Sequence, residues 1–352
     1  MKAWEENIRR VVPYVPGEQP KKEKIIKLNT NENPYPPAPG VEEVIKQMDY
    51  AKFRLYPDPT VGDLVKAIAD RYQLEEDQVF VGVGSDDVLA MAFLTFFNSK
   101  KPILFPDITY SFYDVWAQVF RIPYQVQPLD QKFQIQAEDY KKENGGVIFP
   151  NPNAPTGIAM DLDFIEKILE QNQDVVVIVD EAYIDFGGIS ALPLLKKYEN
   201  LLVVQTFSKS RSLAGIRIGY AMGNRTLIQA MQDVKYSFNS YTMNQPSIQI
   251  GVAALEDVSY FDRTKEKIIA TRERIKPALK ELGFSFLDSK TNFIFASHNS
   301  YAASDIFEYL KANDIYVRYF SSNPRIQNYL RISIGTDLEM DRFIAVLKEY
   351  LK

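Results

Sequence analysis

Short apolar runs alternate with amphipathic stretches through the middle of the chain. The runs lie at residues 79–83, 102–105, 147–150, 175–179, 201–206 and 218–222. Because they are short, rich in β-branched residues and apolar on both faces, they predict buried strands of a mostly parallel sheet. Between them, residues 86–97 and 163–171 show the helical spacing of apolar positions. The pattern therefore predicts an α/β domain in which helices flank a central sheet, as three layers.

The pattern changes after about residue 255. A stretch of helical periodicity runs to Leu282 and stops at Gly283, a residue typical of helix C-termini. The segments beyond it predict strands at 284–287, 292–296, 315–318 and 329–334, and helices at 304–312 and 337–351. We predict a large domain over residues 41–255 and a smaller α+β domain over residues 256–352. The one histidine, His298, follows a predicted strand and is expected at the surface.

Residues 1–40 are predicted to form an N-terminal arm. The prolines of this segment are Pro13, Pro16, Pro20, Pro34, Pro36, Pro37 and Pro39. Such a composition is incompatible with regular helix or with a central strand. We expect an extended arm that lies over the body of the fold or over a partner subunit; a disordered leader is the alternative.

Composition narrows the classes of function. The 352 residues are 46% hydrophobic and 25% charged, as in ordinary globular proteins. The 41 basic and 46 acidic residues give a net charge of −5, so no overall positive field attracts nucleic acid or an anionic membrane. With no cysteine and one histidine, disulfide frameworks, thiolate zinc sites and multi-histidine metal sites are excluded. Because no signal segment or membrane span is evident, we expect a cytoplasmic protein.

The first candidate site is the glycine-containing turn after the first predicted strand. Gly82 and Gly84 precede Ser85, Asp86 and Asp87, at the expected start of a helix. A dinucleotide-binding fingerprint needs a third glycine where Asp87 stands, which disfavours hydride transfer. Backbone amides at a helix N-terminus, together with the Ser85 hydroxyl, suit a phosphate. An ordinary capped strand-to-helix turn explains the same residues.

Two further segments follow the ends of predicted strands, where open α/β sheets bind ligands. The loop 151–157 holds two prolines and a glycine, which favour a tight turn. Asp180 and Tyr183 follow the apolar run 175–179. A carboxylate at the mouth of a buried strand can keep a ligand nitrogen protonated, and Tyr183 offers a hydroxyl nearby. Alternatively, the prolines and glycine of 151–157 only shape a loop, and Asp180 caps a helix or binds a metal.

Lys209 follows the apolar run 201–206 and is flanked by Ser208 and Arg217. A lysine at a strand exit can form an imine with a carbonyl ligand, and the serine and arginine can hold an anion beside it. A solvated surface lysine is the alternative. Taken together, a phosphate cradle, an acid for a ring nitrogen, a phenol and an amine at one sheet edge are the parts that pyridoxal phosphate requires.

These motifs resemble those of the fold-type I pyridoxal-phosphate aminotransferases, and within them the branch that acts on histidinol phosphate. The resemblance covers nearly the whole chain, through Leu-Asn-Thr-Asn-Glu-Asn-Pro-Tyr at 28–35, Leu-Tyr-Pro-Asp-Pro at 55–59 and Leu-Arg-Ile-Ser-Ile-Gly-Thr at 330–336. It implies a fold-type I transferase with pyridoxal 5′-phosphate as cofactor. It also implies a homodimer with composite active sites, because Tyr56 matches a tyrosine that reaches the cofactor phosphate of the other subunit.

The resemblance assigns roles by matching motif. Lys209 matches the lysine that forms the internal aldimine, Asp180 the partner of the pyridinium nitrogen, and Tyr183 the donor to the cofactor's phenolic oxygen. Tyr110 matches the aromatic residue that stacks on the cofactor ring. The implied phosphate site consists of Gly84, Ser85, Asp86, Ser208 and Arg217.

One position departs from the family pattern. Ala154 stands where the family commonly has an asparagine that hydrogen-bonds the phenolic oxygen. Either Tyr183 satisfies that oxygen alone, or Asn153 or a water replaces the missing donor. With one donor fewer to the phenolate, we expect the pKa of the internal aldimine to be higher than with that asparagine in place.

The resemblance also implies a reaction and its substrates. Arg331 matches an arginine that binds the α-carboxylate in related aminotransferases and that faces the phosphate of histidinol phosphate in this branch. Arg318 and Tyr14 match further phosphate contacts, and Asn31 is a fourth expected substrate contact. The expected reaction converts L-histidinol phosphate and 2-oxoglutarate into imidazole-acetol phosphate and glutamate, a step of histidine biosynthesis.

Other functions stay open at this point. Aromatic amino-acid aminotransferases differ in residues of the arm and the small domain. Threonine-phosphate decarboxylases share the motifs of Lys209 and Asp180 but release carbon dioxide, and a non-enzymatic cofactor binder would show colour without turnover. A transcriptional regulator is disfavoured, because the proline-rich arm leaves no room for a DNA-binding segment and the net charge is negative.

Overall fold

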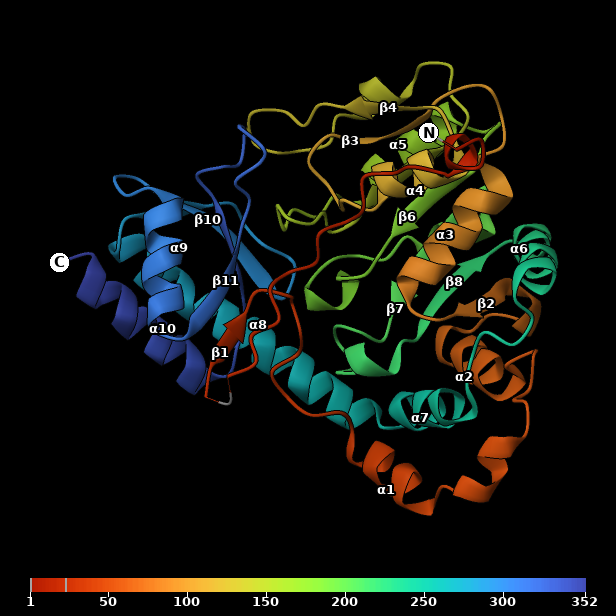
Figure 1. Ribbon diagram of the computed structural model, residues 1–352, viewed down its shortest axis with the longest axis horizontal. Coiled ribbons are helices and arrows are strands. Elements are labelled where there is room, and N and C mark those ends of the chain that lie inside the picture. Colours follow the sequence, from red (N-terminus) through yellow and green to blue (C-terminus); the bar gives the residue numbers. More distant parts are fainter. Residues whose placement is uncertain (1, 23) are drawn as a thin grey trace.

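The computed structural model describes residues 2–22 and 24–352, which form two lobes, each built on its own β-sheet (Figure 1). The strands of the larger sheet are β2 (Val79–Gly82), β3 (Ile103–Pro106), β4 (Tyr124–Gln127), β5 (Val147–Pro150), β6 (Val177–Asp180), β7 (Leu201–Thr206) and β8 (Gly219–Gly223). Their spatial order is β2-β8-β7-β6-β5-β3-β4. β8 runs antiparallel to both of its neighbours, and the other neighbouring strands pair in parallel. The mostly parallel sheet predicted from the apolar runs is confirmed.

Helices cover both faces of the larger sheet. They are α1 (Pro39–Gln47), α2 (Gly62–Tyr72), α3 (Ser85–Phe96), α4 (Tyr113–Phe120), α5 (Leu162–Gln171), α6 (Arg225–Phe238) and α7 (Gln245–Glu256). Alternate residues of one strand enter different cores: Val177 and Val179 of β6 pack with α2, α5 and α7, and Ile178 packs with α3, α4 and α6. The three predicted layers therefore follow from strands that are apolar on both faces.

The smaller sheet draws on both ends of the chain. Its strands are β1 (Ile26–Leu28), β9 (Phe284–Phe286), β10 (Phe293–His298), β11 (Ile315–Tyr319) and β12 (Leu330–Ser333), in the order β1-β11-β12-β10-β9. The helices of this lobe are α8 (Val258–Glu281), α9 (Ala303–Ala312) and α10 (Asp337–Tyr350). The long α8 extends from the larger lobe into the smaller one (Figure 1). Short 3₁₀ helices occur at η1 (Glu5–Asn7), η2 (Tyr50–Arg54), η3 (Glu76–Gln78), η4 (Ala137–Tyr140), η5 (Ile184–Phe186), η6 (Leu192–Lys196) and η7 (Ala214–Ile216).

The N-terminal segment is extended but not free of regular structure. It crosses the front of the molecule from the region of α4 to β1 (Figure 1), and Tyr14 stacks on Phe112 with ring centroids 4.2 Å apart. β1 then pairs in parallel with β11, which the prolines did not predict. The strand can form because residues 26–28 contain no proline, and α1 can begin at Pro39 because the first helical turn needs no proline N–H.

His298 is buried, at 9% exposure, so the surface position expected for it is wrong. Its Nδ1 accepts hydrogen bonds from the backbone N–H groups of Ser300 and Tyr301, each at 3.0 Å. Because Nδ1 accepts, Nε2 carries the proton and donates to the Leu282 carbonyl at 2.7 Å. The imidazole therefore joins the end of α8 to the end of β10.

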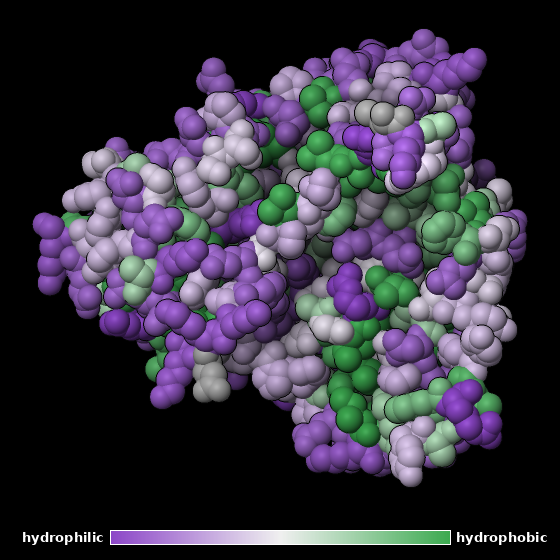
Figure 2. Space-filling model, in the orientation of Figure 1, coloured by the Kyte–Doolittle hydropathy of each residue, from purple (hydrophilic) through white to green (hydrophobic). Residues whose placement is uncertain are grey.

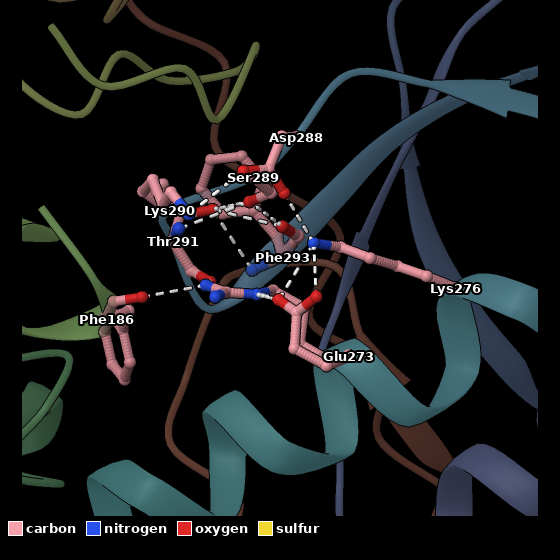
Figure 3. Close-up of polar contacts among 9 residues, drawn as sticks. Phe186, Glu273, Lys276, Asp288, Ser289, Lys290, Thr291 and Phe293 are labelled. Atoms are coloured by element: carbon pink, nitrogen blue, oxygen red, sulfur yellow. Dashed lines mark hydrogen bonds and ion pairs between the residues drawn. The ribbon is translucent and has the colours of Figure 1, made fainter.

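A polar junction on α8 connects the lobes (Figure 3). The buried Arg272 donates from Nη1 to the carbonyls of Phe186, at 2.8 Å, and of Thr291, at 2.7 Å. The N–H of Lys290, in the same turn as Thr291, donates to the carbonyl of Gly157 at 2.8 Å. The turn before β10 is thereby held against both η5 and the loop 151–157 of the larger lobe.

Candidate active site

Two adjoining cavities lie where β5, β6 and β7 end, between the lobes. The sheet-side cavity, of about 130 Å³, is lined in part by Ser85, Asp86, Tyr110, Asp180, Tyr183, Ser208, Lys209 and Arg217. The arm-side cavity, of about 170 Å³, is lined in part by Tyr14, Asn31, Arg318 and Arg331. Tyr110, Ala154, Tyr183 and Lys209 line both. The structure thus brings together most of the residues singled out in the sequence, in two connected groups.

Asp180 places a buried carboxylate at the end of β6. The Tyr113 hydroxyl donates to its Oδ2 at 2.8 Å, and the N–H of Ala182 donates to its Oδ1 at 3.1 Å. Burial raises the pKa of Asp180 from 3.8 to about 6, because the charged form is desolvated, although both hydrogen bonds act in the opposite direction. A protonated ring nitrogen of a ligand would compensate this desolvated charge.

Lys209 and Tyr183 place an amine and a phenol beside this carboxylate. Lys209 lies in the loop after β7, and its Nζ is 3.3 Å from the Thr30 carbonyl and 5.7 Å from the centre of the Tyr183 ring. The Tyr183 hydroxyl lies 2.9 Å from Nδ2 of Asn31. An amine, a phenol and a carboxylate from two neighbouring strand ends therefore border one cavity.

The part of the sheet-side cavity lined by Ser85, Ser208 and Arg217 is suited to an anion. Ser85 begins α3, whose N-terminal amides carry partial positive charge. Arg217 reaches this part with Nη2 3.3 Å from Oδ2 of Asp86 and Nη1 3.5 Å from the Ser208 hydroxyl. A Cβ at Gly84 would collide with the guanidinium, so glycine permits this approach. The Tyr110 hydroxyl donates to Oδ1 of Asp86 at 2.6 Å, and both residues line the cavity.

Two guanidinium groups border the arm-side cavity. Arg331, on β12, donates from Nη2 to the Asn29 carbonyl at 2.9 Å, and burial lowers its pKa from the ordinary value. Among residues 2–22 and 24–352, its buried Nε finds no hydrogen-bond partner. Arg318 makes long contacts of 3.4 and 3.5 Å with arm carbonyls. Both groups are available to an anionic ligand.

Two expected cofactor contacts, Asn153 and Tyr56, line neither cavity of this chain, and Tyr56 was expected to reach the cavity of a second copy. The Asn153 side chain donates to the Ile108 carbonyl and the Thr156 hydroxyl and accepts from the Thr109 hydroxyl, each at 3.0 Å. Asn153 is thus engaged within its loop, and this geometry contradicts the idea that it replaces the donor missing at Ala154. Tyr56 is 82% exposed, packs on Tyr241 and lines neither cavity of its own chain.

Sequence reasoning missed the contribution of Tyr113. The residue is fully buried at the start of α4, and its hydroxyl is one of the two donors to Asp180. A tyrosine 67 positions away carries no sequence signal for this contact. The pairing depends on the packing of α4 against the sheet.

The chain is similar to known proteins over nearly its whole length. The family model described as "Aminotransferase class I and II" matches residues 23–347. Among curated proteins, the histidinol-phosphate aminotransferase of Clostridium acetobutylicum is 52% identical over 348 residues, covering 99% of each chain. That of Brachyspira hyodysenteriae is 52% identical and covers 98% of this chain and 97% of the relative.

A solved structure agrees with this similarity. The histidinol-phosphate aminotransferase of Sinorhizobium meliloti in complex with pyridoxal-5′-phosphate superposes with a TM-score of 0.83 at 26% identity, covering 93% of this chain and 91% of that chain. The fold, the site geometry and the full-length similarity therefore agree, and the chain belongs to the class I and II aminotransferases, which are pyridoxal-phosphate-dependent enzymes.

Proposed function

We propose that this aminotransferase transfers the amino group between L-histidinol phosphate and 2-oxoglutarate, as a cytoplasmic enzyme of histidine biosynthesis. The observation that carries the proposal is that Arg318, Arg331 and Tyr14 border the same cavity as the amine of Lys209. Two guanidinium groups match a substrate that carries a phosphate and a second substrate that carries two carboxylates. The names of the full-length relatives support the same substrate.

The residues of the sheet-side cavity fit pyridoxal phosphate. Its phosphate would be held by Ser85, Ser208 and Arg217 at the N-terminus of α3, and the Asp180 carboxylate would accept a hydrogen bond from its protonated ring nitrogen. Tyr110 would cover the ring, and Tyr183 would donate to the phenolic oxygen. When bound, the cofactor supplies an electron sink for negative charge that develops at the substrate α-carbon.

Lys209 has two roles in this proposal. Its Nζ would hold the cofactor covalently in the resting enzyme and, as a free amine, would accept on that nitrogen the proton that leaves the substrate α-carbon. Lys209 borders both cavities, so its amine is within reach of cofactor and substrate. Arg331 and Arg318 orient the substrate by its anionic group, with the arm residue Tyr14 beside them.

We further propose a homodimer with composite sites. An exposed groove of about 650 Å³ lies between α1, η2, α2 and α7, and Figure 2 shows apolar side chains gathered on this face over α1 and α7. Exposed apolar residues around it include Ile45, Tyr50, Phe53, Leu55 and Tyr56. A second copy that covers this surface would bring its Tyr56 to the cofactor phosphate. Within each copy, residues 41–255 and 256–352 would act as the large and small domains.

Single-turnover absorbance of the purified holoenzyme tests the substrate. The holoenzyme is mixed separately with L-histidinol phosphate, L-phenylalanine and L-threonine phosphate, and the visible absorbance of the cofactor is followed. We expect fast conversion with histidinol phosphate. The Lys209→Ala variant should not convert any substrate, whereas Lys132→Ala, at an exposed lysine, should behave as the parent protein.

Other outcomes would change the proposal in defined ways. Faster conversion by phenylalanine would keep the reaction but reject the substrate assigned to Arg318 and Tyr14. Release of carbon dioxide from threonine phosphate would reject transamination as the main reaction. Absence of a visible cofactor band in the parent protein would reject the cofactor assignment of Lys209.

A further inference from the structure

Asn31 lines the arm-side cavity in the left-handed backbone region, which few residues other than glycine adopt and asparagine adopts more readily than most. Its φ is 56°, in the left-handed region, and it is buried at 1% exposure. Its backbone N–H donates to the Ser333 hydroxyl at 3.0 Å, and its carbonyl accepts from Nδ2 of Asn292 at 2.9 Å. Both backbone polar groups are thus bound by the smaller sheet, which holds the residue in this conformation.

The same contacts orient the Asn31 side chain. The Ser333 hydroxyl already accepts from the Asn31 N–H, so its own proton is free to donate to Oδ1 of Asn31, at 2.9 Å. With Oδ1 facing Ser333, Nδ2 faces the Tyr183 hydroxyl, 2.9 Å away. The amide therefore donates to Tyr183, and the assignment follows from the complete set of contacts.

We infer that Asn31 is a positioning residue that directs the Tyr183 hydroxyl proton toward the cofactor's phenolic oxygen. Because the Tyr183 oxygen accepts from Asn31, the Tyr183 proton is free to donate to another group, and Tyr183 lines the sheet-side cavity as well as the arm-side cavity. An acceptor in Asn31's place would instead attract that proton away from the cavity. The inference rests on the proposed function, since it assigns a partner to the phenol of that site.

Ala154 makes this positioning matter in the present chain. Ala154 lines both cavities and carries no hydrogen-bonding group, and Asn153 is occupied within its loop. Tyr183 is then the side chain left to donate to the phenolic oxygen. A loss of its orientation cannot be compensated by a second donor at residue 154.

Charged and titratable groups around Tyr183 come from several elements. They are Asp180 on its own segment, Lys209 after β7, Arg331 on β12, Tyr110 before α4 and Tyr113 in α4. Substitution of Asn31 by a neutral residue leaves all of these groups in place. A change in the titration of the bound cofactor would therefore report the hydrogen bond of Asn31 and Tyr183.

The test is a pH titration of the visible absorbance of the holoenzyme. In the Asn31→Gly variant, glycine keeps the left-handed backbone and removes the amide. A weaker donor to the phenolate favours the protonated form of the bound chromophore, so the midpoint should rise by about 0.4 to 1 pH unit, the equivalent of one hydrogen bond. Ser333→Ala, which releases Oδ1 of Asn31, should shift the midpoint in the same direction.

Two double variants show whether Asn31 acts through Tyr183. Tyr183→Phe should raise the midpoint at least as far as Asn31→Gly, and adding Asn31→Gly to Tyr183→Phe should produce no further shift. Adding Ala154→Asn to Asn31→Gly restores a donor and should lower the midpoint again.

The possible failures are separable. A parent holoenzyme with a normal visible band and an unshifted midpoint in Asn31→Gly would overturn the inference and leave the proposed function intact. Additive shifts of Asn31→Gly and Tyr183→Phe would also overturn it, because Asn31 would then act independently. A parent protein that shows no visible band would overturn both.

Discussion

Asp180 illustrates how one residue lowers the stability of the fold in order to hold a ligand. The folded protein protonates this carboxyl near pH 6, whereas the unfolded chain does so near 3.8. Between these values the folded state binds a proton that the unfolded state has released, so the contribution of Asp180 to stability falls as the pH rises through this window. Above it, ionisation of the buried group costs about 3 kcal/mol.

We therefore predict opposite effects of Asp180→Asn on stability and on cofactor binding. The cofactor-free variant should melt at a higher temperature than the parent at about pH 8, and the difference should shrink toward about pH 4. Its affinity for pyridoxal phosphate should fall, because the ring nitrogen loses its anionic partner. Calorimetry and cofactor titration measure both quantities.

Asp174→Asn, at an exposed aspartate, serves as the control and should change neither property. A cofactor-free Asp180→Asn protein that is less stable than the parent at every pH would show that the carboxylate is compensated within the protein. That result would contradict the desolvation argument.

At the scale of elements, the connection from α8 to β9 depends on one glycine and one histidine. Gly283 has a φ of 84°, and a Cβ there would lie 2.8 Å from Nε2 of His298. We predict that Gly283→Ala lowers the free energy of unfolding by about 1 to 3 kcal/mol, through backbone strain and displacement of the imidazole. Denaturant unfolding measures the change.

Gly40→Ala provides the matched control for that prediction. Gly40 lies in α1, and a Cβ there would meet the Ala253 carbonyl at an ordinary distance of 3.8 Å. This substitution should be neutral or slightly stabilising, since alanine favours helix. Equal destabilisation by both substitutions would contradict the role given to the His298 turn.

At the scale of the whole molecule, the proposed composite site predicts complementation between subunits. Lys209→Ala and Tyr56→Ala proteins should each have low activity. After subunit exchange, a mixed dimer contains one site with Lys209 from one copy and Tyr56 from the other. Activity of the mixture should therefore rise above the sum of the separate proteins, as measured by amino transfer to 2-oxoglutarate.

The control for complementation is a mixture of Lys209→Ala with a Lys209→Ala, Tyr56→Ala double variant, which cannot form an intact site. If the mixture of single variants also stays inactive although native mass spectrometry of differently tagged copies shows mixed dimers, each site is complete within one chain. That outcome would reject the composite site and would leave the cofactor assignment unaffected.

Chain motifs predicted much of the candidate site because its residues follow strand ends. Ser85, Asp180 and Lys209 each lie within three residues of the end of an apolar run, and parallel strands bring their carboxyl ends to one edge. The arm-side residues were reached through the family resemblance, since Tyr14 and Arg331 lie in distant segments. The motifs did not predict that Tyr113 donates to Asp180, and they left Asn153 as a replacement donor for Ala154, whereas its side chain is bound within its loop. Both outcomes depend on packing between segments.

The sequence by itself determined the layered α/β architecture and the order of the chemical groups along it, because hydrophobic periodicity and strand-end motifs are local properties. Only the tertiary structure decided which groups meet. β1 joins a sheet made by the C-terminal part of the chain, His298 is buried in its turn, and Asn31 is turned toward Tyr183 by Ser333 and Asn292. These contacts join residues far apart in the chain, and their geometry is set by how whole elements pack.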